Sequence, residues 1–284
     1  MNSSSPHSPL VKNQSARDEA KNLWNLVPCG DVVDAPHGSL QYFLQIETLR
    51  YRVQNWQHSY FKFEDFKGKK ILEIGVGQGT DQAQFAKAGA VCHGIDITQN
   101  HLELTALNFK RRGFKIDLRT ADATAIPFPD GDFDAVYSFG VIHHIPDVDM
   151  VLREAHRVIQ PGGMIMLAVY NRWSVYWIIK MVFMLGLLRL WLVTKGLGGL
   201  KATIETGADG VKIKPYVCLD SKKIFARKIQ RAGFVISDIP IHQLHADHFM
   251  PKRLVSSLGW LVKPLIPLLE SRMGWYITVK ASKN

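Results

Sequence analysis

The sequence contains few cysteines, and none of them forms a recognisable pair. Its 284 residues include three cysteines that are far apart and show no C-x-x-C spacing, namely Cys29, Cys92 and Cys218. No signal-peptide pattern is present at the N-terminus, where the chain is rich in Ser, Asn and Pro and lacks hydrophobic periodicity. A disulfide-stabilised fold is therefore not expected, and the composition predicts a reduced, cytoplasmic protein.

Acidic residues are scarce in one part of the chain. The formal net charge is +10, and much of the excess falls in residues 171–230. The acids of this stretch are Glu205, Asp209 and Asp220, whereas its basic residues are Arg172, Lys180, Arg189, Lys195, Lys201, Lys212, Lys214, Lys222, Lys223, Arg227 and Lys228. Such a stretch favours an anionic partner, and peripheral contact with an anionic membrane is one interpretation. No aromatic-basic RNA-binding module is present, so we expect no nucleic-acid partner.

Short apolar runs alternate with amphipathic ones from residue 70 onward, which is typical of βαβ units. The predicted strands span 70–74, 91–95, 114–119, 133–138, 164–170, 234–239 and 275–280. The sequence therefore predicts a Rossmann-like α/β fold, with a seven-stranded sheet flanked by helices. We interpret residues 1–37 as a flexible tail and lead-in, and residues 38–284 as one domain.

A glycine-rich loop follows the first predicted strand. It reads Glu-x-Gly-x-Gly-x-Gly, with Glu73 followed by Gly75, Gly77 and Gly79. Glycines between a strand and a helix let a ligand approach the backbone closely, although they also serve ordinary turns. The G-x-G-x-x-G pattern of dinucleotide enzymes would require glycine at position 80, where this chain has Thr80. The spacing therefore argues against a nicotinamide cofactor.

Two aspartates follow the next two predicted strands. Asp96 ends the second strand, where its carboxylate can accept hydrogen bonds from both hydroxyls of a ribose. Asp122 follows the third strand, at the edge of the crevice where an adenine amino group would meet an acceptor. The glycine loop, Asp96 and Asp122 follow three successive strands. Their joint pattern is therefore much more specific for a ligand site than the glycine loop alone. It indicates a nucleoside-containing ligand.

Four segments in this order resemble the class I S-adenosylmethionine (SAM)-dependent methyltransferases, especially those similar to ubiquinone and menaquinone C-methyltransferases and small-molecule O- and N-methyltransferases. They are LEIGVGQGTD (72–81), GIDIT (94–98), ADATAIPFPDGDFDAVYSFGVIHHIPD (121–147) and REAHRVIQPGGMIML (153–167). The resemblance implies SAM as cofactor. It further implies that Glu73 and Gly75 to Gly79 hold the methionine part, Asp96 with Ile97 the ribose and adenine edge, Asp122 with Ala123 the adenine, and Phe139 with Gly140 the floor beneath the sulfonium.

Paired histidines directly after the fourth predicted strand are candidate catalytic residues. An imidazole titrates near neutral pH, so His143 or His144 can act as a general base if the methyl acceptor must lose a proton. The alternative is a structural role for both. Three further histidines follow the sixth strand at three-residue spacing, namely His242, His245 and His248. No cysteine or second carboxylate pattern reinforces a metal site there, so we assign no metal ligands.

An apolar insert of 21 residues, 173–193, follows the fifth predicted strand. Its length is sufficient to cross a bilayer, but it contains Lys180 and Arg189. Inserting a charged residue near the centre of a membrane helix costs about 2.5–3.5 kcal/mol. Four interpretations remain open: a lid over the substrate pocket, an interfacial membrane anchor, a transmembrane span and a structural insert that buries its face on the sheet. The insert extends to residues 171–215, and a second apolar segment spans 249–269.

We therefore predict a SAM-dependent methyltransferase that acts on a small, apolar or membrane-proximal acceptor at an O, C or N atom. A SAM-binding membrane adaptor without catalytic activity is the first alternative, and an RNA methyltransferase is the second. The sequence lacks an Asn-Pro-Pro-Tyr or Asp-Pro-Pro-Tyr motif after the fourth strand, which disfavours RNA methylation.

Overall fold

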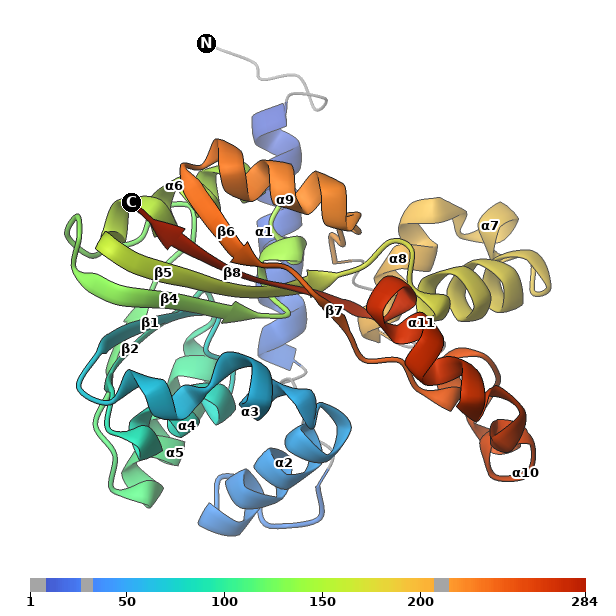
Figure 1. Cartoon of the computed structure of the whole chain (residues 1–284), viewed down its shortest axis with the longest axis horizontal. Coiled ribbons are helices and arrows are strands. Elements are labelled where there is room, and N and C mark those ends of the chain that lie inside the picture. Colours follow the sequence, from blue (N-terminus) through green and yellow to red (C-terminus); the bar gives the residue numbers. More distant parts are fainter. Residues whose placement is uncertain (1–8, 27–32, 207–214) are drawn as a thin grey trace.

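The computed structural model describes residues 9–26, 33–206 and 215–284. Within these ranges, an eight-stranded sheet forms the centre of the molecule (Figure 1). The strands are β1 (Lys70–Ile74), β2 (Val91–Asp96), β3 (Asp117–Thr120), β4 (Phe133–Phe139), β5 (Ile159–Tyr170), β6 (Phe234–Asp238), β7 (Ile241–His242) and β8 (Tyr276–Lys283). Their order is β3-β2-β1-β4-β5-β8-β6, and β7 pairs with β8. The Rossmann-like α/β prediction is confirmed.

The predicted count of seven strands was wrong. The additional strand, β7, has only two residues and pairs antiparallel with β8, Ile241 opposite Ile277 and His242 opposite Tyr276. Two residues are too few to produce the alternation by which a strand is recognised in a sequence. The seven predicted strands are all present, β1 with the predicted ends and the other six with one or both ends shifted. For example, β5 begins at Ile159 instead of residue 164.

The central strands explain where a ligand can bind. β1 pairs in parallel with β2 and with β4. Its residues Ile71 and Leu72 are fully buried on opposite faces, because helices cover both sides of the sheet. The carboxyl ends of β1, β2 and β4 therefore meet at one edge, which is where ligands bind in parallel α/β sheets.

Helices cover the two faces of the sheet through separate apolar cores. On one face, Leu152 of α6 and Phe225 of α9 pack in a core that includes Leu72. On the other, Phe85 of α4 and Phe109 of α5 pack with Ile71. The helices and 3-10 segments of this part are α2 (Leu40–Val53), α3 (Trp56–Phe61), η1 (Phe63–Phe66), α4 (Thr80–Ala88), α5 (Gln99–Arg112), η2 (Ile142–His144), α6 (Val148–Val158) and α9 (Lys222–Arg231).

The predicted flexible tail contains a helix, α1 (Pro9–Leu26). Leu23 is buried, and the backbone carbonyl of Asn25 accepts a hydrogen bond of 3.3 Å from the Asn100 side chain in α5. Because only Ala20 and Leu23 of its described side chains are buried, α1 carries no apolar stripe that a sequence pattern would reveal. The correction matters for function, because α1 lies over the ligand edge of the sheet.

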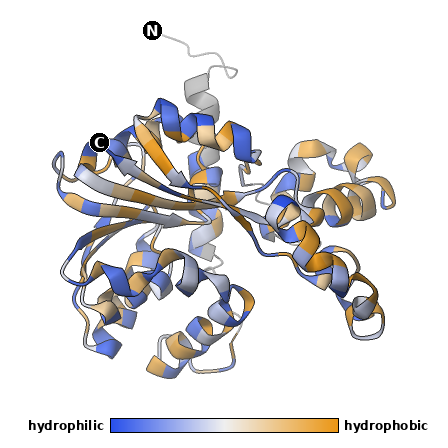
Figure 2. Ribbon diagram, in the orientation of Figure 1, coloured by the Kyte–Doolittle hydropathy of each residue, from blue (hydrophilic) through white to orange (hydrophobic). Residues whose placement is uncertain are grey.

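The apolar insert after β5 forms a helical lobe beside the sheet, as predicted (Figure 1). It consists of the π-helix η3 (Tyr176–Leu187), α7 (Trp191–Thr194) and α8 (Gly196–Thr206). The second apolar segment joins the lobe as η4 (Ala246–His248), α10 (Lys252–Val262), η5 (Lys263–Leu265) and α11 (Ile266–Met273). Lys180 of η3 forms an ion pair of 3.6 Å with Asp247 of η4. Figure 2 shows hydrophobic residues throughout both segments.

The predicted 21-residue apolar run is not one helix. Leu190 has a φ of 56°, in the left-handed region, so the chain turns between η3 and α7. In the described ranges, no helix combines the length and the apolar character needed to cross a membrane. Lys212, Lys214 and Asp209 of the basic stretch, and Cys29, lie outside the described residues.

Candidate functional site

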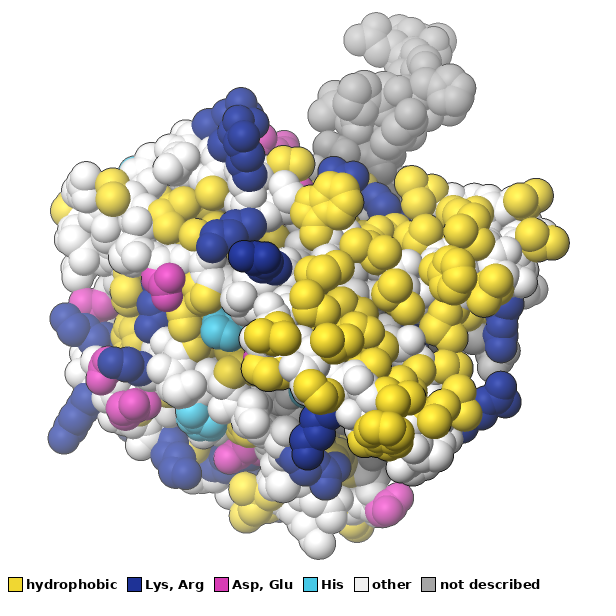
Figure 3. Space-filling model, turned by 45° about the vertical axis from the view of Figure 1, so that its right-hand side comes forward, with side chains coloured by type: hydrophobic (Ala, Val, Ile, Leu, Met, Phe, Trp, Pro, Cys, Tyr) yellow, Lys and Arg dark blue, Asp and Glu magenta, His cyan; other side chains and the backbone are white. Residues whose placement is uncertain are grey.

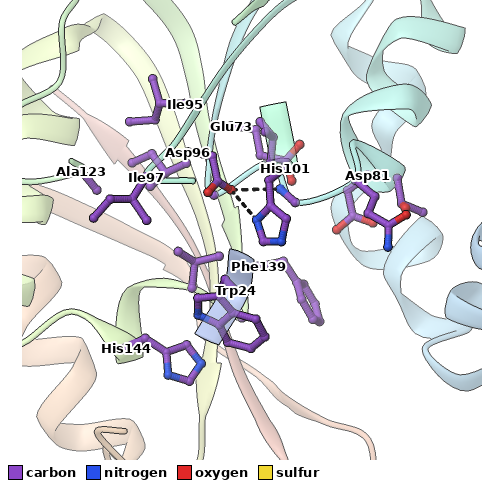
Figure 4. Close-up of a pocket in the computed structure, with 18 of the residues that line it drawn as sticks. Trp24, Glu73, Asp81, Ile95, Asp96, Ile97, His101, Ala123, Phe139 and His144 are labelled. Atoms are coloured by element: carbon purple, nitrogen blue, oxygen red, sulfur yellow. Dashed lines mark hydrogen bonds and ion pairs between the residues drawn. The ribbon is translucent and has the colours of Figure 1, made fainter. Parts of the chain in front are cut away.

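A pocket of about 360 Å³ opens at the carboxyl edge of β1, β2 and β4 (Figure 4). Eight of the nine predicted cofactor residues line it: Glu73, Gly75, Gly77, Asp96, Ile97, Asp122, Ala123 and Phe139. The ninth, Gly79, does not line the pocket. A Cβ at Gly79 would lie 2.8 Å from Cγ2 of Thr105, so this glycine allows the loop to pack against α5.

The glycine loop bends sharply around the pocket. Gly75, Gly77 and Gly79 all have φ values between 54° and 76°, which L side chains rarely adopt. Gly75 also donates a hydrogen bond of 2.8 Å to the carbonyl of Ile95 on β2. A Cβ at Gly75 would lie 2.5 Å from Cγ2 of Val141, in the segment after β4. This position therefore requires glycine for both its backbone conformation and the space around it.

Asp96 is buried at the end of β2 and holds the surrounding backbone in place. Its Oδ1 accepts hydrogen bonds from the backbone N (2.9 Å) and hydroxyl (2.8 Å) of Thr98, and its Oδ2 accepts one of 3.2 Å from the Gly77 backbone. His101 Nδ1 lies 3.2 Å from Oδ2. Burial alone would raise the pKa of Asp96, but the hydrogen bonds and charge of His101, with those from Thr98, lower it. Asp96 is therefore held as a carboxylate facing the pocket.

Asp122 lies at the end of the pocket that α1 covers. Its Oδ2 forms an ion pair of 3.1 Å with Nε of Arg17, and its Oδ1 accepts hydrogen bonds from the backbone and hydroxyl of Thr124. The Arg17 guanidinium also donates to the Thr124 hydroxyl at 3.0 Å. The predicted adenine acceptor is thus partly occupied by a side chain from α1. A nucleobase that bonds to Asp122 would share this carboxylate with Arg17.

Glu73 is a buried carboxyl group with one oxygen unpartnered among the described residues. Its Oε2 forms no hydrogen bond there. Burial raises the pKa of Glu73 strongly, the charges of Asp81 and Asp96 raise it further, and Arg50 lowers it in part. A buried acceptor without a partner at the pocket wall is suited to bind a cationic donor group, such as the amino group of a methionine moiety.

A polar cluster that the sequence did not reveal lies beside Glu73. Arg50 of α2 makes a bidentate ion pair with Asp81, its Nε lying 2.6 Å from Oδ1. The hydroxyls of Tyr51 and Tyr137 also donate to Asp81, at 2.8 and 2.9 Å. Because Arg50 and Asp81 both line the pocket, this cluster joins α2 to the start of α4 across the ligand edge.

The paired histidines occupy different environments. His144 lines the pocket near Trp24 of α1, with ring centroids 5.7 Å apart (Figure 4). His143 does not line the pocket, and its ring lies 3.8 Å from that of Tyr170. Burial lowers the pKa of His143 far below its usual value, and the neighbouring His144 lowers it further. His143 is therefore neutral near pH 7, and His144 is the member of the pair that can reach a ligand.

The three later histidines do not form a metal-binding group. The ring of His242 stacks on Trp56 at 4.3 Å, and His248 packs edge-on against Tyr176 at 5.3 Å. His245 lies next to His248, with ring centroids 5.4 Å apart. Within the described ranges, one group of side chains has spacing suitable for a metal ion, and it consists of His143, His144 and Glu205.

The geometry fits SAM as a ligand. The volume lies within the range of small-molecule sites, about 300–1,000 Å³. Glu73 offers an unpartnered buried carboxyl oxygen, Asp96 a carboxylate, and the glycine loop leaves room for close backbone contact. Residues that sequence reasoning missed include Arg17, Trp24, Arg50, Asp81 and His101, which come mostly from α1, α2 and the first residues of helices.

Comparison with known proteins finds similarity to methyltransferases over part of the chain. A family model described as a methyltransferase domain matches residues 72–167. The ubiquinone biosynthesis O-methyltransferase of Pseudomonas aeruginosa is 37% identical over 107 residues, which cover 37% of this chain and 46% of that protein. Phosphoethanolamine N-methyltransferase 2 of Caenorhabditis elegans is 32% identical over 114 residues, which cover 39% of this chain and 26% of that protein. The matches thus span less than half the length of these relatives.

Solved structures share the fold over a larger part of the chain. A SAM-dependent methyltransferase from Methanosarcina mazei has a TM-score of 0.57 at 18% identity, covering 78% of this chain and 96% of that one. The cyclase SpnF has a TM-score of 0.53 at 18% identity, covering 96% of this chain and 93% of that one. A fold shared with a cyclase does not by itself define the reaction, which depends on the site.

Proposed function

We propose that this chain, whose residues 72–167 match a methyltransferase-domain model, transfers a methyl group from SAM to a small, apolar or membrane-proximal acceptor. The observation that carries this proposal is a single pocket that brings together Glu73, Asp96 and Asp122 with His144. Three of these residues suit the cofactor, and His144 lies at the wall formed by the segment after β4. The acceptor atom can be O, C or N, since relatives include both O- and N-methyltransferases by name.

The composition of the pocket wall supports an apolar acceptor. Apolar side chains from α1, α2 and the segment after β4 line the pocket: Trp24, Ile46, Leu49, Val53, Val141 and Ile145. Such a wall binds an apolar ring or chain by removing it from water, at about 25 cal/mol per Å² of apolar surface.

The residues of the pocket would align the reactants and accept a proton. SAM, when bound, supplies a methyl group on a positively charged sulfur, so its leaving group needs no activation by the protein. Asp96 and Glu73 would fix the cofactor, and alignment can contribute several kcal/mol to the rate. His144 donates from Nδ1 to the Tyr216 carbonyl at 2.9 Å, because a carbonyl can only accept. Its Nε2, which lies 3.7 Å from Oε1 of Glu205, is then the ring nitrogen left to take a proton from an acceptor hydroxyl or amine.

The substitution His144→Gln tests the catalytic assignment. The assay measures transfer of labelled methyl from SAM into the organic extract of host cells, together with SAM affinity by calorimetry. We expect turnover to fall about 10²–10⁴-fold, with SAM affinity changed only a few-fold. The exposed His58→Gln is the matched control. Unchanged turnover in His144→Gln would refute the assignment, and SAM binding without turnover in the unmodified chain would favour the non-catalytic adaptor.

A broad apolar surface supports membrane proximity. Figure 3 shows hydrophobic side chains gathered on the face formed by the helical lobe. Its most exposed large apolar residues are Leu188, Leu190 and Val193 of the insert and Trp260 and Leu268 of the second segment. Exposed apolar areas of this extent mark interaction sites in soluble proteins.

The charges around this face support an anionic partner. Among the described residues of 171–206 and 246–273, the exposed charged side chains are all basic: Arg172, Arg189, Lys195, Lys252, Arg253, Lys263 and Arg272. The three acids of these ranges are partly buried and engaged. Tyr170 donates to Glu205, Lys180 pairs with Asp247, and the Gln243 backbone donates to Glu270. An apolar face with only positive exposed charges suits an anionic bilayer surface.

A further inference from the structure

Two buried histidines and a partly buried glutamate converge behind the pocket wall on the side of the helical lobe. They are His143 and His144 of η2 and Glu205 of α8, and one potential ligand atom from each lies within 4.8 Å of the other two. His143 and His144 are 3% and 5% exposed. The Glu205 side chain is 11% exposed. The site lies next to the cofactor pocket, because His144 also lines that pocket.

The hydrogen bonds around His144 leave its Nε2 facing a second hydrogen-bond acceptor, Oε1 of Glu205. Its Nδ1 must carry a proton, since it bonds to the Tyr216 carbonyl at 2.9 Å. In the neutral ring, Nε2 then presents a lone pair, and Nε2 lies 3.7 Å from Oε1 of Glu205. Tyr170 donates to the same Oε1 at 2.9 Å. A lone pair opposite a carboxylate is favourable only with a cation between them, which is a proton or a metal ion.

His143 distinguishes the two kinds of cation. Neither nitrogen of its ring has a hydrogen-bond partner among the described residues, although the ring is almost fully buried. A proton shared by His144 and Glu205 would leave His143 unsatisfied, at about 1–3 kcal/mol. A metal ion would bind one nitrogen of His143 as well as Nε2 of His144 and Oε1 of Glu205, so that each of the three side chains would have a partner and only the protonated nitrogen of His143 would remain without one.

We propose that His143, His144 and Glu205 form a binding site for a divalent transition-metal ion, with Zn²⁺ as the best match. Two imidazoles and one carboxylate form a ligand set that Zn²⁺ prefers, and three protein ligands leave a fourth position open. Tyr170 and the Tyr216 carbonyl orient Glu205 and His144 from outside, as second-sphere partners do in metal sites. Ligand atoms around tetrahedral Zn²⁺ lie roughly 3.4 Å apart, so the ion would draw the three side chains together. The sequence pattern had predicted no metal ligands.

The proposed function gives this site a role, although metal binding itself does not depend on it. Because His144 borders the pocket, an open metal position on that side could bind an acceptor hydroxyl and lower its pKa. The ion would then replace His144 as the group that promotes loss of the acceptor proton. The site would favour acceptors with a hydroxyl group over those with an aliphatic carbon.

Metal binding is measured on the full chain, free of affinity tag and of SAM. The protein is stripped with chelator, loaded with ZnCl₂, passed through gel filtration and analysed by plasma mass spectrometry, and Zn²⁺ affinity is measured by calorimetry. We expect one Zn²⁺ per chain, with affinity lowered at least tenfold by Glu205→Gln and by His144→Gln. The exposed Glu103→Gln is the matched control and should bind Zn²⁺ like the unmodified chain.

SAM affinity and thermal unfolding of each variant establish that it is folded, since Glu205 does not line the cofactor pocket. Cobalt(II) loading gives a second readout, because a four-coordinate site absorbs visible light and the Glu205→Gln protein should lose that spectrum. Absence of bound Zn²⁺ in the folded chain would overturn the proposal. So would equal binding by Glu205→Gln. None of these results bears on methyl transfer, which is measured separately.

Discussion

The carboxyl groups of the pocket show how far single residues can be inferred from local sequence. Glu73, Asp96 and Asp122 each stand at the end of a predicted parallel strand, and the topology brings such positions together. The partner of Asp81 could not be found in the same way. Arg50 lies 31 residues earlier and reaches Asp81 only because α2 folds over the glycine loop. No periodicity or spacing encodes a contact between two separate elements of this kind.

The raised pKa of Glu73 predicts that cofactor binding releases a proton. In the cofactor-free protein, burial and the charges of Asp81 and Asp96 raise this pKa above the usual 4.5, partly offset by Arg50. The ammonium group of SAM would favour the carboxylate, so affinity should increase as pH rises through the folded-state pKa and then level off. Calorimetry in buffers of different ionisation enthalpy measures the released proton.

The variant Glu73→Gln should bind SAM more weakly and without this proton release. Proton release of the same size in the variant, or affinity that falls over the same pH range, would contradict the role of Glu73. The effect of Glu73 on folding stability has the opposite pH dependence to its effect on SAM affinity. Because the folded-state pKa is above the unfolded one, the contribution of Glu73 to stability is present below about pH 4.5 and is lost as pH rises through the folded-state pKa.

At the scale of elements, the loop between β1 and α4 allows a prediction for Gly75→Ala, with Gly68→Ala as its matched control. In Gly75→Ala, a positive φ costs about 1–2 kcal/mol, and the contact with Val141 adds about 1–3 kcal/mol. Gly68 has nearly the same φ, 74°, but nothing lies within 4 Å of the place that a Cβ would take there. We therefore expect Gly75→Ala to unfold at clearly lower urea concentration than Gly68→Ala and to lose SAM binding.

The double variant Gly75→Ala, Val141→Ala separates the two causes. It removes the two closest contacts, with Cγ1 and Cγ2 of Val141, and leaves the backbone strain and a contact of 3.0 Å with Cβ, so it should recover part of the urea resistance lost in Gly75→Ala. Equal stability of Gly75→Ala and Gly68→Ala would show that close packing against Val141 is not required. SAM binding by Gly68→Ala should remain within a few-fold of the unmodified chain, since Gly68 does not line the pocket.

Elements with a strong pattern were predicted, and elements stabilised by tertiary contacts were not. The β1 segment could be recognised because a strand buried on both faces is rich in apolar residues, here Ile71, Leu72 and Ile74. Helix α1 could not, because few of its residues are buried and its position depends on Arg17, Leu23 and Asn25 contacting distant segments. Its place over Asp122 and His144 had no signal in the sequence.

At the scale of the whole molecule, the apolar face of the lobe predicts binding to anionic vesicles. Trp260 and Leu268 are 67% and 71% exposed, so Trp260→Ser with Leu268→Ser should leave the fold intact. Burying a large apolar side chain contributes about 1.5–3 kcal/mol, and about 1.4 kcal/mol is tenfold in affinity. We expect this double variant to sediment with phosphatidylglycerol vesicles at least tenfold more weakly.

Salt and lipid charge test the electrostatic part of the same interaction. Binding should weaken at high salt and on pure phosphatidylcholine, since the exposed charges around the face are basic. Val91→Ser, a change at an exposed apolar residue outside the lobe, is the matched control. Equal binding to neutral and anionic vesicles, or no effect of the double variant, would contradict a membrane-facing role.

The most direct test of the account is the identity of the methylated product. The protein is incubated with methyl-labelled SAM and an extract of its host, and the products are partitioned into organic and aqueous fractions and identified by mass spectrometry. The account predicts label in an organic-extractable small molecule, and loss of that label in Asp96→Asn but not in Asp117→Asn, a carboxylate outside the pocket. Label confined to RNA or to polar peptides, or unchanged labelling by Asp96→Asn, would contradict it.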